Sequence, residues 1–271
     1  MTLSGRTRVF TILAHPSTYV VAPLIYNHIF SRMGLDMVYI AHNVTPEAIP
    51  SMVKSFSGWQ NLGGFNVTIP HKESIVAHLN SLCEVSSRTG IVNTVVRQED
   101  GSLSGYNTDG LGAMGALGDV QGATCLVIGA GGAAKAIVEA MLSYGVRHIS
   151  IMNRSYSSAL KLRDLFGDTR VDIYGGEPLK DIDIVIQATP VADEIPFGLE
   201  VGRFKRHTRI LETIMRPTAL SEAALRLGLD LIPGHAMLYH QTTKNFELFT
   251  GLDLPRQRVD EAFTSAGYSP L

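Results

Sequence analysis

This sequence of 271 residues is poor in several features, and each scarcity excludes a class of protein. It has two cysteines, Cys83 and Cys125, and no CxxC pair, which excludes a disulfide framework. No apolar run reaches the roughly 18 residues of a membrane-spanning helix, so no membrane contact is expected. The first 17 residues hold only a short apolar run, too short for a signal peptide, which favours a cytoplasmic protein.

Charged residues are also scarce, at 18%, below the quarter or so of an average globular chain. Lys and Arg number 23 against 25 Asp and Glu, and no basic stretch stands out, so nucleic acid is a poor candidate for a partner. The nine histidines show no metal-ligand spacing such as HExxH, and no GxSxG motif occurs. The sequence therefore predicts neither a metal centre nor a serine hydrolase.

The sequence does contain a regular alternation of short apolar runs with helix-like segments. In the first hundred residues, apolar runs predict strands at 9–14, 37–42 and 63–69. Amphipathic segments predict helices at 23–34, 46–56 and about 72–80. Asp100-Gly101 predicts a hairpin between strands at 93–96 and 102–107. Such alternation is typical of β/α units over a mostly parallel sheet.

A second series of the same kind begins near residue 122. It opens with a strand, a glycine turn and a helix within 124–145, and continues with strands and helices at 148–153, 157–167, 181–190, 209–215 and 220–229. A last amphipathic segment, 237–251, predicts a C-terminal helix. A division near residue 110 gives two α/β domains, the first with a mostly parallel sheet and the second of the Rossmann type.

The glycine turn is Gly129-Ala130-Gly131-Gly132-Ala133-Ala134, which matches the GxGxxA form of the dinucleotide fingerprint. The first glycine permits a tight turn, the second lets the backbone approach a pyrophosphate, and the small last residue lets helix and strand pack closely. Amides at the helix N-terminus then bind phosphate oxygens. The alternative is a turn used only for close packing, but the strand–turn–helix context favours NAD(P) binding.

The type of cofactor depends on the end of the next predicted strand, where an acidic residue commonly bonds the ribose 2′-hydroxyl. Here that position reads Asn153-Arg154-Ser155, without an acid. Arg154 suits a 2′-phosphate and therefore favours NADP. NAD stays an alternative, because Asn153 can bond a ribose hydroxyl and an arginine can stack on adenine.

Two polar positions have more than one interpretation. Lys72 ends the nearly uncharged stretch GFNVTIPHK (64–72), near a predicted helix start, where the helix dipole disfavours a cation by about 0.3–1 kcal/mol. It is either an exposed residue or a working group. His71 beside it is expected to be a solvated neighbour, with tuning of Lys72 or contact with the substrate as the alternative. Asn107, Thr108 and Asp109 stand between glycines ahead of an apolar segment, where Thr108 or Asp109 would also serve as a helix cap.

An ordered set of segments runs from about residue 9 to 245: NVTIPHK, GIVNTVV, DGSLSGYNTDGLG, VIGAGGAAKA, NRS, ATP and GHAMLYHQ. This set resembles the shikimate dehydrogenase family, which includes quinate/shikimate dehydrogenases. The resemblance implies NAD(P)-dependent interconversion of a secondary alcohol and a ketone on a cyclic polyol acid such as shikimate or quinate. It also implies a catalytic domain at 1–110, a Rossmann NAD(P)-binding domain at 111–236, and C-terminal helices at 237–271 that return to the catalytic domain.

The resemblance also implies roles for individual residues. Lys72 and Asp109 form the catalytic pair, in which the lysine handles the hydroxyl proton while hydride passes to the nicotinamide. Thr68, Asn93 and Gln241 bond substrate hydroxyls; their alternatives are hydrogen bonds within a strand or turn and, for the last, an exposed helix position. The implied cofactor residues are Gly129, Ala130, Gly131, Gly132, Ala133, Asn153, Arg154, Thr189 and Met237. The alternative for the methionine is core packing.

The sequence departs from the family where the substrate carboxylate is bound. Val20 and Ala22 occupy the positions of two carboxylate-binding serines, and Met215 replaces a tyrosine that faces the same group. A hydrogen bond to a charged group contributes about 1.5–3 kcal/mol, so these losses lower the affinity for shikimate by orders of magnitude. Candidate replacements are Ser17, Thr18, Tyr19 and Arg216, of which the arginine is either a carboxylate partner or a surface residue. We expect the reaction type to be retained and the substrate head group to be altered.

Two functions stay open from the sequence. The first is a dehydrogenase that acts on a small cyclic hydroxy acid. The second is a catalytically weak regulatory protein that binds nucleotide and ligand on the same fold. Retention of Lys72 and Asp109 favours the enzyme, and the lost anchors favour the regulatory protein. The sequence leaves the oligomeric state open, with a homodimer as one alternative.

Overall fold

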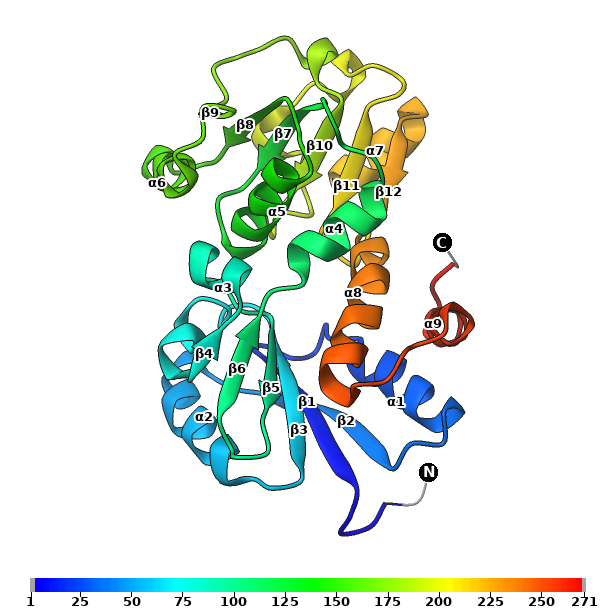
Figure 1. The fold of residues 1–271 in the computed structure, drawn as a ribbon. Helices are drawn as coiled ribbons and strands as arrows, with labels where there is room; N and C mark the ends of the chain where they lie inside the picture. Colours follow the sequence, from blue (N-terminus) through cyan, green and yellow to red (C-terminus); the bar gives the residue numbers. More distant parts are fainter. Residues whose placement is uncertain (1–2, 270–271) are drawn as a thin grey trace. The chain divides into compact units, whose positions relative to one another are not determined.

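The computed structural model describes residues 3–269 and divides into two compact units, each built on its own six-stranded sheet (Figure 1). Unit 1 comprises the residues up to Thr108 together with those from Gln241 onwards, and unit 2 runs from Asp109 to His240. Within residues 3–269, no helix has the length and apolar character needed to cross a membrane.

The sheet of unit 1 has the strand order β2-β1-β3-β5-β6-β4. The strands are β1 (Arg8–Ala14), β2 (Met37–Asn43), β3 (Leu62–Val67), β4 (Ser81–Leu82), β5 (Thr94–Arg97) and β6 (Leu103–Tyr106). β1 pairs in parallel with β2 and β3, whereas β5 runs antiparallel to β3 and β6. The predicted hairpin is present, and Asp100 Oδ1 accepts from the amide of Ser102 in its turn at 2.9 Å.

The helices of unit 1 come from both ends of the chain. They are α1 (Ala22–Arg32), α2 (Ile49–Gly58), α3 (Glu84–Thr89), α9 (Arg256–Ser265) and the C-terminal part of α8 (Gly234–Thr250), with 3₁₀ turns at η1 (Pro46–Ala48) and η2 (Ser74–His78). α9 packs beside α1, where Arg32 pairs with Glu261 at 3.3 Å. The C-terminal helices therefore belong to unit 1 (Figure 1).

The predicted helix at about 72–80 is wrong, because only the short 3₁₀ turn η2 forms there. The chain leaves the helical conformation at Leu79 and joins the sheet edge immediately afterwards. Asn80 donates its amide to the carbonyl of Leu103 at 2.9 Å and accepts the amide of Leu103 on Oδ1 at 2.8 Å. Pairing with the start of β6 thus ends the turn before a second helical turn can form.

The core of unit 1 between α1, α8 and the sheet is aromatic. Tyr26 of α1 stacks on Tyr39 of β2 with ring centroids 4.7 Å apart, and Phe249 of α8 packs on Phe10 of β1 at 5.0 Å. A Cβ on Gly64 of β3 would lie 2.9 Å from the Phe249 ring, so glycine is required for this close approach. Aromatic pairs of this kind contribute about 0.5–1.5 kcal/mol beyond their buried area. They fix α8 on the sheet of unit 1.

The sheet of unit 2 is entirely parallel, with the order β12-β11-β10-β7-β8-β9. Its strands are β7 (Thr124–Ile128), β8 (His148–Met152), β9 (Val171–Ile173), β10 (Ile184–Gln187), β11 (Arg209–Glu212) and β12 (Asp230–Ile232). Its helices are α4 (Asp109–Leu117), α5 (Gly132–Ser143), α6 (Tyr156–Phe166), α7 (Ala219–Leu227) and the N-terminal part of α8; 3₁₀ turns η3 (Leu179–Asp181), η4 (Pro196–Gly198) and η5 (Val201–Arg203) lie between β9 and β11. The predicted fold class of two α/β domains, one of the Rossmann type, is confirmed.

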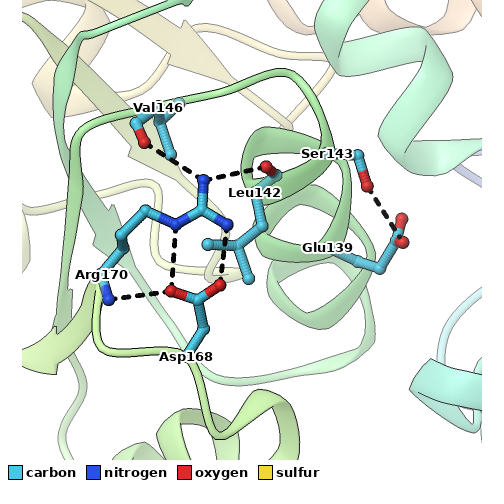
Figure 2. A network of polar contacts seen from close by, with 6 residues as sticks. All are labelled: Glu139, Leu142, Ser143, Val146, Asp168 and Arg170. Carbon is cyan, nitrogen blue, oxygen red and sulfur yellow. Dashed lines mark hydrogen bonds and ion pairs between the residues drawn. The ribbon is translucent and has the colours of Figure 1, made fainter.

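A charged hydrogen-bond network closes the C-terminal end of α5 (Figure 2). The guanidinium of Arg170 binds both carboxylate oxygens of Asp168, at 3.0 and 2.7 Å, and donates to the carbonyls of Leu142 and Val146. Helix C-termini leave carbonyls unpaired and carry partial negative charge, so a cation stabilises them. Hydrogen bonds from Arg170 lower the pKa of Asp168 to about 2. The network anchors the helix that follows the glycine turn.

Candidate active site

Lys72 follows a turn that the sheet of unit 1 holds in place. The amide of Thr68, the first residue after β3, donates to the carbonyl of Leu13 in β1 at 3.0 Å. The carbonyl of Thr68 accepts from the amide of His71 at 2.8 Å, and the carbonyl of Lys72 accepts from the amide of Val92 at 2.9 Å. The backbone on both sides of Lys72 is therefore fixed, and the residue is partly buried.

The expectation that His71 is a solvated neighbour is wrong, because His71 is completely buried. Its Nε2 lies 2.8 Å from the carbonyl oxygen of Val44, which can only accept, so Nε2 carries the proton. Burial lowers the pKa of the imidazole, which is neutral at pH 7. This hydrogen bond connects His71, the residue before Lys72, to the loop after β2. The uncharged stretch around it was the signal in the sequence that could have indicated burial.

A buried polar network joins β3, β5, the residues after β6, and α8. Asn93 Oδ1 accepts from the amide of Thr108 at 2.9 Å and lies 2.9 Å from the hydroxyl of Thr94. Asn245 Oδ1 lies 2.9 Å from the hydroxyls of both Thr94 and Thr108. Asn66 Nδ2 donates to the hydroxyl of Thr94 at 3.0 Å. The network fixes Thr108, the residue directly before Asp109.

The remaining residues implied for catalysis and substrate binding lie at the ends of helices or within them. Asp109 is buried and opens α4 as the first residue of unit 2. Gln241 is 9% exposed, so the alternative of an exposed helix position does not apply to it. It lies one helical turn before Asn245 on α8. Asn93 does make the turn hydrogen bonds offered as its alternative role, and its substrate contact stays a prediction, as do those of Thr68 and Gln241.

The glycine turn has the geometry that a pyrophosphate requires. Gly129 has φ +117°, and a Cβ there would lie 2.7 Å from the carbonyl oxygen of Ala188, so only glycine fits. A Cβ on Gly131 would meet no protein atom within 4 Å, so the space beside it is open to a ligand. Gly131 is also the N-cap of α5, and no side chain caps it. The first-turn amides of α5 thus fit a phosphate group.

The other implied cofactor residues lie at the carboxyl end of the same sheet, on both sides of the point where strand order reverses. Asn153, after β8, donates from Nδ2 to the carbonyl of Ser155 at 2.9 Å, and Arg154 is exposed. Thr189, after β10, donates to Gln187 Oε1 at 3.1 Å. Nucleotides bind in parallel sheets at this edge and at such a reversal. Met237 is buried in the apolar core of unit 2, as the alternative of core packing predicts for this residue.

The positions that depart from the family motif lie in both units. Val20 and Ala22 flank Val21, the N-cap of α1, and no side chain caps this helix. Arg216, a candidate replacement anchor, lies in unit 2 and pairs with Asp193 at 3.2 Å, with both side chains exposed. Met215 precedes it and is partly buried. Of the candidate replacements, Tyr19 contacts the turn that precedes Lys72: its hydroxyl donates to the carbonyl of Ile69 at 3.4 Å and also bonds the side chain of Thr68.

Glu212 is a buried acidic residue that the sequence reasoning did not single out. It ends β11, is 2% exposed, and pairs in register with Gln187 of β10. Its Oε1 accepts from the hydroxyl of Thr218, which also caps α7, while Oε2 is buried without a hydrogen-bond partner. Burial raises the pKa of the carboxyl from 4.5 to about 7. The position at a strand end beside the nucleotide edge was the available signal.

Unit 2 is thus a Rossmann-type nucleotide-binding unit, joined in one chain to an α/β unit with a lysine on a fixed turn. Two family profiles match the chain: the shikimate dehydrogenase substrate binding domain over residues 12–95, and shikimate / quinate 5-dehydrogenase over residues 113–210. The chain belongs to the shikimate dehydrogenase family.

Three of the proteins that this chain is similar to are two shikimate dehydrogenases and a keto-sugar reductase. It is 36% identical to the shikimate dehydrogenase (NADP(+)) of Rubrobacter xylanophilus, over 93% of each chain. It matches the structure of shikimate 5-dehydrogenase from Thermus thermophilus in complex with NADP(H) and shikimate with 31% identity and a TM-score of 0.85, over 96% of this chain and 99% of the other. It matches 5-ketofructose reductase of a Gluconobacter strain with 27% identity and a TM-score of 0.83, over the same shares.

Proposed function

We propose that this protein is an NADP-dependent oxidoreductase that interconverts a secondary alcohol and a ketone on a polyhydroxylated substrate of the shikimate or quinate kind. The proposal depends mainly on the position of Lys72. Backbone hydrogen bonds on both sides and the buried side chain of His71 fix the turn that carries this lysine. The family resemblance assigns this lysine and Asp109 to the reaction. NADP is favoured over NAD by exposed Arg154 and by the Rubrobacter relative, which is named for NADP.

The proposed reaction balances with these groups. The bound nicotinamide would accept or supply hydride. When the alcohol is oxidised, its carbon loses hydride and its hydroxyl proton passes to the Lys72 side chain, leaving a carbonyl. When the ketone is reduced, the Lys72 ammonium returns a proton to the oxygen. The Asp109 carboxylate, buried at the start of α4, would orient the ammonium and the hydroxyl. Thr68, Asn93 and Gln241 would hold neighbouring hydroxyls.

Residues at the carboxyl edge of the sheet of unit 2, together with Met237, would hold the cofactor. The amides of Gly132 and Ala133 at the start of α5 would bind the pyrophosphate. Gly131 would let it approach, since no protein atom lies within 4 Å of the position of a Cβ there. Asn153 and Arg154 would bind the ribose and its 2′-phosphate. Ala130 and Thr189 would line the edge of the sheet, and Met237 would lie beside the nicotinamide.

The relatives limit how far the substrate can be specified. The Thermus structure contains shikimate, a ring acid, whereas the Gluconobacter reductase is named for a keto-sugar. The proposal therefore covers ring acids and their analogues, and the head group is a separate question. A cytoplasmic location and a homodimer stay predictions from the sequence.

The proposal is tested by initial rates of NAD(P)H formation with shikimate, quinate and related ring polyols, each with NADP and with NAD. Lys72→Ala is expected to lower kcat about 10²- to 10⁴-fold, the usual contribution of a positioned acid–base group. Lys54→Ala, which removes an exposed lysine of unit 1, is the matched control and should leave kcat unchanged. Equal rates in the two variants would contradict the role of Lys72. NADP binding without turnover of any substrate would instead favour the regulatory binding protein.

A further inference from the structure

The first turn of α4 lies directly against the backbone of α5, entirely within unit 2 (Figure 1). A Cβ on Gly110 would lie 2.6 Å from the carbonyl oxygen of Ala136 and 2.7 Å from the Cβ of Ala140. Both distances are about 1 Å shorter than an ordinary contact between non-bonded atoms, and the first obstacle is backbone, which cannot rotate away. Only glycine therefore allows the two helices to approach each other this closely at this point.

The backbone conformation of Gly110 gives no other reason for a glycine. It is the residue after the first of α4, and its φ is not among the positive values that favour glycine. Glycine also lowers the stability of a helix relative to alanine. The close contact with α5 is thus the feature of the structure that requires glycine here.

The rest of α4 is fixed within unit 2, so the helix cannot shift as a whole to make room. At its C-terminal end, the guanidinium of Arg209 in β11 donates to the carbonyl of Leu117, and to that of Asp119 at 2.7 Å. In its middle, a Cβ on Gly115 would lie 2.6 Å from Cγ of His240, so the helix also packs closely on α8. A side chain at position 110 would therefore displace the start of the helix.

The start of α4 is Asp109, which the proposed function assigns to the reaction. It directly precedes Gly110, and its side chain is buried. A displacement of this turn away from α5 therefore moves the carboxylate. On α5, Ala136 lies one helical turn after Gly132, whose amide is proposed to bind the pyrophosphate. Two helices in backbone contact thus hold the carboxylate and the phosphate-binding amides.

We infer that Gly110 is a positioning residue, which by lacking a side chain fixes the Asp109 carboxylate relative to the helix that binds the cofactor. The inference rests on the proposed function and adds to it a residue that acts through Asp109. The carboxylate has to lie within hydrogen-bond reach, about 2.6–3.2 Å, of the groups that it orients. A displacement of about 1 Å takes it out of that range, and misplacement on this scale costs about 100-fold in rate.

The variant Gly110→Ala tests the inference. Initial rates are measured with NADP on the substrate that the wild type turns over best among shikimate, quinate and related ring polyols. We expect kcat to fall about 10- to 100-fold. The Kd of NADPH, from its fluorescence, should stay near the wild-type value, because the N-terminal amides of α5 keep their place. Gly118→Ala is the control just past the opposite end of α4: with φ +71° it should lose stability in urea unfolding but keep kcat.

A double-mutant cycle separates the positioning of Asp109 from a general structural effect. In an Asp109→Asn background, the addition of Gly110→Ala should lower kcat little further, since the group that it displaces has already lost its charge. Ala140→Val enlarges the α5 side chain that faces Gly110. It displaces the start of α4 without altering this helix, and we expect a loss of kcat of the same kind. This variant decides the question if Gly110→Ala does not fold.

Different outcomes would contradict the inference and the proposed function. Wild-type kcat in Gly110→Ala, or in Ala140→Val, would overturn the inference and leave the proposed function intact. The same holds if Gly110→Ala causes an equal fold-loss with and without Asp109→Asn. Wild-type rates in Lys72→Ala, or no turnover of any substrate although NADPH binds, would contradict the proposed function, and the inference would fall with it.

Discussion

At the residue scale, Glu212 is a carboxyl group of unit 2 whose pKa lies far from its ordinary value. One carboxyl oxygen accepts from the Thr218 hydroxyl and the other is buried without a partner. Burial disfavours the charged form, which raises the pKa from 4.5 to about 7. Asp168, in the same unit, shows the opposite effect, because hydrogen bonds from Arg170 stabilise its charge and lower its pKa. The pKa values of these two carboxyl groups are therefore shifted in opposite directions, because burial disfavours the charge of Glu212 whereas Arg170 stabilises that of Asp168.

The raised pKa of Glu212 predicts a dependence of stability on pH. A carboxyl whose pKa is higher in the folded than in the unfolded protein stabilises the fold fully below about pH 4.5, and this contribution is lost as the pH rises through about 7. The loss amounts to about 3 kcal/mol at most, from 1.36 kcal/mol for each pKa unit. Glu212→Gln cannot ionise, so we expect a flatter profile in urea unfolding at pH 5, 6.5 and 8.

The control for Glu212 is Glu222→Gln, which changes an exposed glutamate on α7 and should keep the wild-type profile. The measured quantity is the difference in unfolding free energy between variant and wild type at each pH. Parallel profiles for wild type and Glu212→Gln would show that Glu212 is not responsible for the pH dependence.

At the scale of elements, α8 contains residues of both units and contributes Asn245 to the buried polar network of unit 1. Asn245 lies on its C-terminal half and bonds the hydroxyls of Thr94 and Thr108, which come from β5 and from the residues after β6. Gln241 precedes it by one helical turn. The helix thereby sets the position of the chain just before Asp109, through Thr108. Buried polar networks of this kind are costly to leave partly satisfied.

Asn245→Ala is expected to destabilise the protein by about 1–3 kcal/mol, because buried hydroxyls lose an acceptor. It should also lower kcat more than it changes the Kd of NADP, since the displaced residues belong to unit 1 and adjoin Asp109. Urea unfolding, initial rates and NADP titration measure the three quantities. Thr243→Ala, an exposed position on the same helix, is the control. A change in stability with unaltered kcat would show that Asn245 has a structural role only.

At the scale of the whole molecule, each unit folds around its own sheet, and a ligand of one unit stabilises that unit. NADP at 100 times its Kd adds about 2.7 kcal/mol to the unfolding free energy of the unit that binds it. In Gly131→Val, the added side chain meets no protein atom within 4 Å of its Cβ and the backbone has φ −86°, so the fold should be retained, at a cost of about 1 kcal/mol because valine is a poorer N-cap than glycine. The side chain would instead occupy the space of the pyrophosphate.

We therefore expect Gly131→Val to be only about 1 kcal/mol less stable than the wild type without NADP and to lose the stabilisation by NADP, as measured by calorimetry. Gly129→Ala is the contrasting variant. Its φ of +117° and the nearby carbonyl of Ala188 make any side chain costly, so it should be destabilised even without ligand. If NADP stabilised Gly131→Val as much as the wild type, the glycine turn would serve close packing alone.

Much of the fold was readable from the sequence because local patterns determine it. The continuous apolar runs of β7 and β10 predict a buried parallel sheet, which the structure confirms. The glycine turn predicts that one edge of this sheet binds a nucleotide. The hairpin at Asp100-Gly101 is likewise a local signal. The prediction of a helix at about 72–80 was wrong because Asn80 is hydrogen-bonded to Leu103, which is distant in the sequence. The partners of single residues, such as the carbonyl of Val44 that His71 bonds, could not be predicted from the sequence either.

The sequence by itself determined the two α/β sheets, the glycine turn and the family, since these depend on periodicity and on residues close together in the chain. Only the tertiary structure decided which polar residues are buried together. It placed Asn93, Thr94, Thr108 and Asn245 in one network, although 151 positions separate Thr94 from Asn245. It also set Tyr19 against the turn that carries Lys72, 50 positions from Ile69. Contacts over such distances follow from the packing of whole elements, which no local pattern encodes.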